Sequence, residues 1–180
     1  LVSQPMSRTD ILMGKFIGIS ISILAAFILG ICVPVAVFAF SETGLTVMLA
    51  GILLTLSFIA LAFLASTLTR DKAKGIGLAL MIWFYCSIIF DALVLLFLFM
   101  FSDYPLEKVL IGLTALNPID LARIMVLLQL DISALMGYTG ALYQKFFGSG
   151  IGLAFSFVMQ IVWVIVPLLF SLRIFAKKDL

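Results

Sequence analysis

The chain has 180 residues, of which 64% are hydrophobic and only 11% are charged, and its net charge is +2. Soluble domains carry about 25% charged residues, so this composition places the chain in a lipid bilayer. The weak and scattered positive charge gives no indication of nucleic acid as a partner. The sequence also lacks histidine, the commonest general base and metal ligand, so it predicts neither an enzyme nor a metal site.

The chain opens on a polar segment, residues 1–15, that precedes the first apolar stretch. Pro5 prevents a helix from continuing from upstream, and the spacing of Ser7 and Asp10 matches a capping box at a helix start. We expect this helix to enter the membrane near Lys15. Composition alone indicates a loop that caps a transmembrane helix. Because the sequence does not begin with methionine, we expect it to lack an N-terminal part.

Four stretches are long and apolar enough to cross a bilayer, which takes about 20 residues. They are residues 16–40, 45–69, 76–101 and 151–172. Pro34 and Pro167 fall inside the first and the fourth, and we expect each to kink its helix, since neighbouring helices can satisfy the freed carbonyls. The sequence therefore predicts an all-α polytopic membrane protein. Cys32 and Cys86 lie inside apolar stretches and are expected to be buried thiols rather than a disulfide.

The connections between these stretches predict the topology. Residues 41–44 form a tight turn, so the first two helices should make an antiparallel hairpin. If each stretch crosses the membrane, successive connections lie on opposite sides, and eight basic residues then fall on one side and three on the other. The eight are Arg8, Lys15, Arg70, Lys72, Lys74, Arg173, Lys177 and Lys178; the three are Lys108, Arg123 and Lys145. The positive-inside rule then predicts a cytoplasmic C-terminus and an outer connection over residues 102–150.

The outer connection contains a pattern typical of an amphipathic helix. Asn117 and Pro118 suit an N-cap followed by proline at the first helical position. Apolar residues then recur at helical spacing, while Asp120 and Arg123 lie on another face. We expect about three turns at the membrane surface, with that charged face pointing away from the membrane on its outer side. A break at residues 137–140 and a second short interfacial helix over residues 141–147, ended by residues 148–150, complete the connection.

Asp91 is the one charge within the third stretch. A carboxylate at that position costs about 2.5–3.5 kcal/mol on insertion scales unless it is paired, protonated or hydrated. Two interpretations follow from the residue itself. Asp91 either faces a translocation path or a helix interface, or it is a structural carboxylate near the outer interface that bonds to a serine or tyrosine of a neighbouring helix.

Four segments resemble the permeases of type-2 ABC exporters, the ABC-2 family. They are the turn from Pro5 to Lys15, the Lys74-x-x-Gly77 helix start followed by Trp83 and Asp91, residues 116–123, and residues 133–140. The last two are similar to the NosY group of that family, which serves the maturation of nitrous oxide reductase. The resemblance covers the whole chain. In this sequence Arg123 comes only three residues after Asp120, a departure from the group's pattern.

The resemblance implies a fold, a role and partners. The permease would have six membrane helices, of which this chain holds the last four, and would pair with a second copy in the bacterial inner membrane. Pro5, Arg8, Asp10 and Lys15 would form the coupling segment that docks on a NosF-like ATPase. That separate subunit would bind ATP and magnesium, since this chain has no phosphate-binding glycine loop and is expected to carry no cofactor.

The outer helix would serve a second partner. The resemblance implies a periplasmic NosD-like protein, and we expect its contact at Asn117, Pro118, Asp120 and Arg123. The family role would be assembly of the copper–sulfur site of the reductase, by transport or by force relayed to the partner. Two other classes stay open from the residues: a proton-coupled secondary carrier that uses Asp91, and a membrane anchor that transports nothing.

Overall fold

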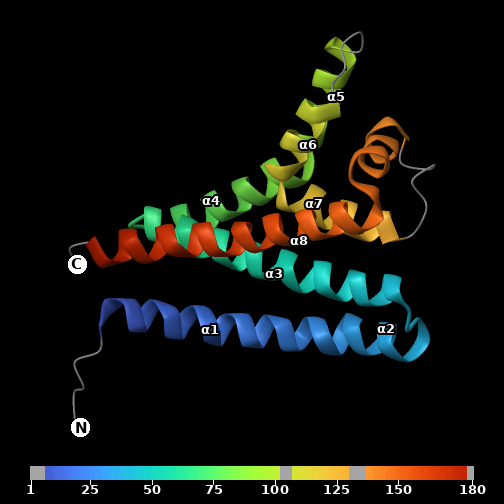
Figure 1. The fold of residues 1–180 in the computed structure, drawn as a ribbon. Helices are drawn as coiled ribbons and strands as arrows, with labels where there is room; N and C mark the ends of the chain where they lie inside the picture. Colours follow the sequence, from blue (N-terminus) through green and yellow to red (C-terminus); the bar gives the residue numbers. More distant parts are fainter. Residues whose placement is uncertain (1–6, 102–106, 130–136, 178–180) are drawn as a thin grey trace.

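The computed structural model describes residues 7–101, 107–129 and 137–177, and all of its regular elements there are helical. The first part of the chain forms α1 (Arg8–Phe27), a π-helical turn η1 (Ile28–Cys32), α2 (Val33–Phe38) and α3 (Glu42–Leu68). The second part forms α4 (Lys72–Phe84), a π-helical turn η2 (Tyr85–Ile89), α5 (Phe90–Met100), α6 (Glu107–Ala115), α7 (Pro118–Gln129) and α8 (Gly137–Lys177). Figure 1 shows their arrangement.

Four helical spans are long and apolar enough to cross a membrane, and they coincide with the four predicted stretches. They cover Thr9–Phe38, Glu42–Leu68, Lys72–Met100 and Gly150–Ala176. The prediction of an all-α polytopic membrane protein is therefore confirmed. The exposed surface of these spans is mostly apolar, as a lipid-facing surface must be, and both cysteines are buried and free.

Figure 1 shows the predicted hairpin and also which helix ends lie together at each end of the bundle. The α1–α2 span runs antiparallel to α3, and the turn between them lies at one end of the bundle. The N-terminal end of α1, the start of α4 and the C-terminal end of α8 lie together at the opposite end. This arrangement agrees with the grouping of the basic residues on one side, because those residues flank the same three helix ends.

Polar side chains cap the first turns of α1, α3 and α4, where the sequence predicts connections between the apolar stretches. Ser7 and Asp10 form both bonds of the expected capping box: the Asp10 amide donates to Ser7 Oγ at 3.1 Å, and the Ser7 amide donates to the Asp10 carboxylate at 3.3 Å. Ser41 Oγ accepts from the Gly44 amide at 3.1 Å and begins α3. Asp71 accepts from the Ala73 amide at 3.0 Å and begins α4. Such caps satisfy donors that a helix start leaves unpaired.

The two prolines lie inside continuous helical spans. Pro34 falls in the first turn of α2, directly after η1, where the Val33 amide donates to the Ile28 carbonyl five residues back. A local π-helical turn is one way in which a membrane helix adapts to a proline that lacks a donor. Pro167 lies inside α8, which continues to Lys177. The expected kinks at these prolines stay predictions.

The centre of the bundle is α3, which packs against α1, α4, α7 and α8. Small side chains permit this: Ala60, Ala65 and Ser57 of α3 are 0% exposed. Gly51 makes the closest approach, because a Cβ there would lie 2.2 Å from Cζ of Phe27 in α1. The C-terminal half of α3 joins α1 and α8 through a cluster in which the Phe16 and Phe63 rings meet edge to face at 5.5 Å.

The outer connection departs from the sequence prediction in three ways. The predicted helix after Asn117 is confirmed as α7, but α6 precedes it and was not predicted. Residues 137–140 begin α8 rather than forming a break, and the expected short helix over 141–147 is part of α8 rather than a separate element. The apolar face of α7 is buried against protein instead of resting on the membrane surface, since Leu121, Met125 and Ile124 are at most 4% exposed.

Candidate functional site

The α6–α7 elbow, residues 115–118, is the feature around which the chemically distinctive side chains gather. Helices α6 and α7 meet there at an angle of 113°, as in a broken or re-entrant membrane span. Only Leu116 and Asn117 separate the two helices. The Leu116 amide donates to the Leu113 carbonyl at 3.0 Å and the Asn117 amide to the Thr114 carbonyl at 3.2 Å. These bonds close the end of α6 before the chain turns.

Asn117 holds the elbow with two side-chain hydrogen bonds. Its Oδ1 accepts from the Ile119 amide at 3.0 Å, which makes Asn117 the N-cap of α7, as predicted. Its Nδ2 donates to the carbonyl of Cys86 at 2.9 Å, in the third span. Asn117 is 0% exposed, so neither bond competes with solvent. Pro118 fills the first helical position, where its missing donor is harmless.

The Cys86 carbonyl needs this donor because it lies in the π-helical turn η2. In an α-helix the Phe90 amide would donate to Cys86, four residues back. In η2 that amide donates to Tyr85, five residues back. The register change thus takes the usual partner away from Cys86 O, and Asn117 Nδ2 supplies another. Single π-turns within α-helices often mark functional positions, and this one marks a helix-to-helix tether.

A second tether joins the elbow to the last span. Trp163 of α8 donates from Nε1 to the carbonyl of Ala115 at 3.0 Å. Ala115 is the last residue of α6, where carbonyls lose their helical partners. A partly buried indole N–H and a carbonyl at a helix end therefore satisfy each other. The elbow is fixed to the third span by Asn117 and to the fourth by Trp163.

A charged cluster lies one turn beyond the elbow. Arg123 of α7 donates from Nη2 to Asp91 Oδ2 at 3.0 Å and from Nη1 to Asp120 Oδ1 at 3.2 Å. One guanidinium thus joins two carboxylates, one from its own helix and one from α5. The side chains of Arg123, Asp91 and Asp120 are 47%, 32% and 9% exposed. The three residues border a cavity of about 200 Å³, whose remaining lining is mostly apolar.

The rest of α7 is held by α3 and α8. Met125 and Ala122 pack with Ala50 and Leu54 of α3 and with Leu153 of α8. At the far end, Gln129 Nε2 donates to the Glu42 carboxylate at 3.1 Å. Helix α7 therefore contacts all three of the other spans that surround it, so displacement of α3, α5 or α8 must move or strain it.

The predicted outer residues are brought together, but not in the expected orientation. Asp91 lies at a helix interface, which is one of the two interpretations offered by the sequence, and its partner is Arg123 rather than a serine or tyrosine. The expectation that Asp120 faces outward is wrong, because Asp120 is 7% exposed. Asn117 and Pro118 are also buried within this chain. Arg123 alone of the four is well exposed, and binding of a periplasmic partner there stays a prediction.

The predicted coupling residues are described only in part. Pro5 lies outside the described residues, and so does the side chain of Arg8, the first residue of α1. Asp10 serves in the capping box, and Lys15 is exposed at the border of a large apolar cavity. Docking of an ATPase on this segment stays a prediction.

Two participants in the site were not found from the sequence. Cys86 contributes a backbone carbonyl, whose availability depends on a π-turn that no sequence pattern indicates. Trp163 sits in an apolar stretch where a tryptophan needs no special explanation. Its indole N–H, which requires a partner when buried, was the only available signal.

The full length of the chain, residues 1–180, matches the family model described as ABC-2 family transporter protein. The chain belongs to the ABC-2 transporter family. Members of this family are membrane permease subunits that work with an ABC ATPase, and this permease is accordingly a multi-pass membrane subunit. The predicted resemblance to ABC-2 permeases is confirmed.

Two curated relatives carry the same printed name, "Probable ABC transporter permease protein NosY". The protein from Stutzerimonas stutzeri is 28% identical over 99% of this chain and 67% of its own length. The protein from Pseudomonas aeruginosa is 29% identical over 76% of this chain and 54% of its own length. This ABC-2 permease chain thus spans about two thirds of one relative, and its match covers about half of the other.

Proposed function

We propose that this chain is the membrane part of an ATP-driven machine that serves nitrous oxide reductase maturation. In this proposal it lies in the bacterial inner membrane with its C-terminus in the cytoplasm and pairs with a second permease copy. A NosF-like ATPase binds ATP and magnesium on the cytoplasmic side, and a NosD-like protein binds on the other. The family match and the names of the two relatives support the permease role and the maturation system.

The observation that carries the mechanism is a path from the capping turn to α7 through two buried clusters, which are joined by helix α3. The capping box fixes the start of α1. Phe16, about two turns further on, forms a buried cluster with Ile59 and Ala60 of α3, and Leu168 of α8 packs against this cluster. A push on the polar turn therefore reaches α3 and α8 through a buried contact rather than through a flexible link.

The helix α3 then carries the displacement across the membrane. Its 27 residues make a rod of about 40 Å, long enough to span the bilayer. Near its N-terminal end, Ala50 packs on Met125 of α7, and Glu42 bonds to Gln129. In this proposal, ATPase closure shifts α3 relative to the third span, and the elbow converts that shift into a rotation of α7. The output is transport or force on the outer partner.

The proposal is tested first at the capping turn, which is the proposed docking segment for the ATPase. Arg8→Glu reverses one charge where the ATPase is proposed to dock, so we expect less ATPase to co-purify with the permease while membrane insertion stays normal. Arg173→Glu, at an exposed cation near the same end of the bundle, is the matched control and should leave the yield unchanged. Equal ATPase recovery with Arg8→Glu and the parent chain would refute the assignment of the coupling segment.

Two other functions make different predictions. A proton-coupled carrier that uses Asp91 should stop when a protonophore collapses the proton gradient and should survive loss of the ATPase, whereas the permease should do the reverse. The bond between Asp91 and Arg123 favours the permease, because it assigns the carboxylate to a helix tether. A membrane anchor should need the elbow and the ATPase but give no flux of any solute in reconstituted vesicles.

A further inference from the structure

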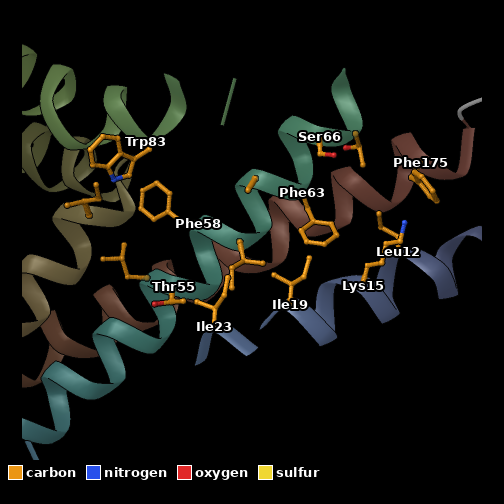
Figure 2. A pocket seen from close by; sticks show the side chains of 15 residues that line it. Leu12, Lys15, Ile19, Ile23, Thr55, Phe58, Phe63, Ser66, Trp83 and Phe175 are labelled. Atoms are coloured by element: carbon orange, nitrogen blue, oxygen red, sulfur yellow. The ribbon is translucent and has the colours of Figure 1, made fainter. Parts of the chain in front are cut away.

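A large apolar cavity opens between α1 and α3, and none of the elbow residues 115–118 lines it. Its volume is about 890 Å³, near the upper end for small-molecule sites. Figure 2 shows α1 and α3 on two sides of it, with Trp83 of α4 at one end and Phe175 of α8 at the other. Isoleucine, leucine and phenylalanine side chains supply most of its lining.

The cavity has one charged end and a long apolar body. Lys15 lies beside Leu12 and Phe175, at the end where α1 begins and α8 finishes (Figures 1 and 2). Ile19 and Ile23 follow on the same face of α1, so the lining continues for eight residues, about 12 Å, past the lysine. Both isoleucines are more than 40% exposed in this chain, which leaves the cavity open along its side.

Among the described residues, the Lys15 ammonium at the end of the cavity has no ion-pair partner. The ion pairs among the described residues all involve Arg123, so Lys15 is not neutralised there. Within the lining, Thr55 already donates to the Gly51 carbonyl of its own helix at 2.7 Å. The site therefore offers one cation and a mainly apolar surface, with three hydroxyl side chains, those of Thr55, Ser66 and Thr67, as its other polar groups.

We propose that this cavity binds an anionic phospholipid of the surrounding bilayer, with one acyl chain along Ile19 and Ile23 and the headgroup phosphate at Lys15. A lysine near a helix end extends its ammonium to the headgroup level while its methylenes stay on apolar surface. The match is one of charge and polarity: an anion joined to a long hydrocarbon chain meets a cation at the end of an apolar cavity. The inference does not rest on ATPase coupling or on the identity of any cargo.

Spin-labelled lipids test the headgroup contact. The chain is reconstituted in phosphatidylcholine vesicles with labelled phosphatidylglycerol or labelled phosphatidylcholine, and the motionally restricted fraction is measured by electron paramagnetic resonance. We expect the chain to prefer phosphatidylglycerol by about fivefold, the effect of one lysine near an anionic surface. Lys15→Gln should abolish this preference. Lys72→Gln, at an exposed lysine that lines a different cavity, should retain it.

A second pair of variants tests the acyl-chain contact. Ile23→Trp fills the body of the cavity and should release both labelled lipids, whereas Ile21→Trp, at an exposed residue outside the cavity lining, should release neither. No preference for phosphatidylglycerol, or equal loss in the Lys15 and Lys72 variants, would overturn the proposal. So would an efficient disulfide between two copies through Ile19→Cys that excludes labelled lipid, because a second copy would then occupy the cavity.

Discussion

Replacing Asn117 with alanine removes two hydrogen bonds from the elbow at once. Loss of the N-cap of α7 costs about 1 kcal/mol. Loss of the bond to the Cys86 carbonyl costs about 0.6–1.7 kcal/mol, the range for polar contacts between membrane helices. Because Asn117 is 0% exposed, water cannot replace either bond without opening the elbow. We therefore expect Asn117→Ala to lower the free energy of unfolding by about 2 kcal/mol.

The measurement is reversible denaturant unfolding in mixed micelles, followed by far-ultraviolet circular dichroism. Asn117→Ser keeps a side chain that can cap α7 but is too short to reach the third span, so its loss should be about half as large. Gln129→Ala is the matched control, since it removes an exposed amide at the other end of the same helix. Asn117→Ala with a loss no larger than that of Gln129→Ala would refute the tether.

Three further predictions follow from the packing and the charges. Arg123→Met should destabilise the chain more than the double variant Asp91→Asn/Arg123→Met, because the single change leaves two carboxylates facing each other, and a double-mutant cycle in the same unfolding assay measures the coupling. Gly51→Ala should cost about 1–3 kcal/mol through its clash with Phe27 and should be partly rescued by Phe27→Leu; additive losses in the two variants would contradict that contact. On a background without Cys32 and Cys86, a single cysteine at position 145 should be labelled from outside and one at position 178 only after permeabilisation, and the reverse pattern would overturn the topology.

The parts of the fold that the sequence predicts well are those set by local chemistry. The four spans follow from composition and length alone. The caps at Ser7 and Asn117 follow from which side chains can reach the first free amides of a helix. The helix after Pro118 follows from the spacing of its apolar residues. Each of these signals lies within a few residues of the feature it predicts.

The site itself depends on contacts that no local pattern contains. Asp91 and Arg123 are 32 residues apart, and nothing in either neighbourhood indicates the other. The burial of Asp120 was missed because an amphipathic helix was assumed to have lipid on one side and water on the other. Helix α7 instead lies among α3, α8 and η2, so its polar face also meets protein. Helix α6 is only nine residues long, too short to be recognised as a span.

The π-turn η2 also sets the rotational phase of everything that follows it in the third span. The five residues Tyr85–Ile89 advance the helix by about as much as four α-helical residues, because the hydrogen bond that closes this turn reaches five residues back instead of four. Winding the same residues as a regular α-helix would therefore rotate α5 by about 100°, the turn of one α-helical residue. Asp91 would then point away from Arg123 although every residue of the cluster remained in the sequence. Disulfide formation between cysteines at positions 91 and 123 would report that change. The π-helical winding of this segment is thus as much a determinant of the site as the identity of its side chains, and a one-residue gap there in a related permease would restore the α-helical repeat without changing the direction of the carboxylate.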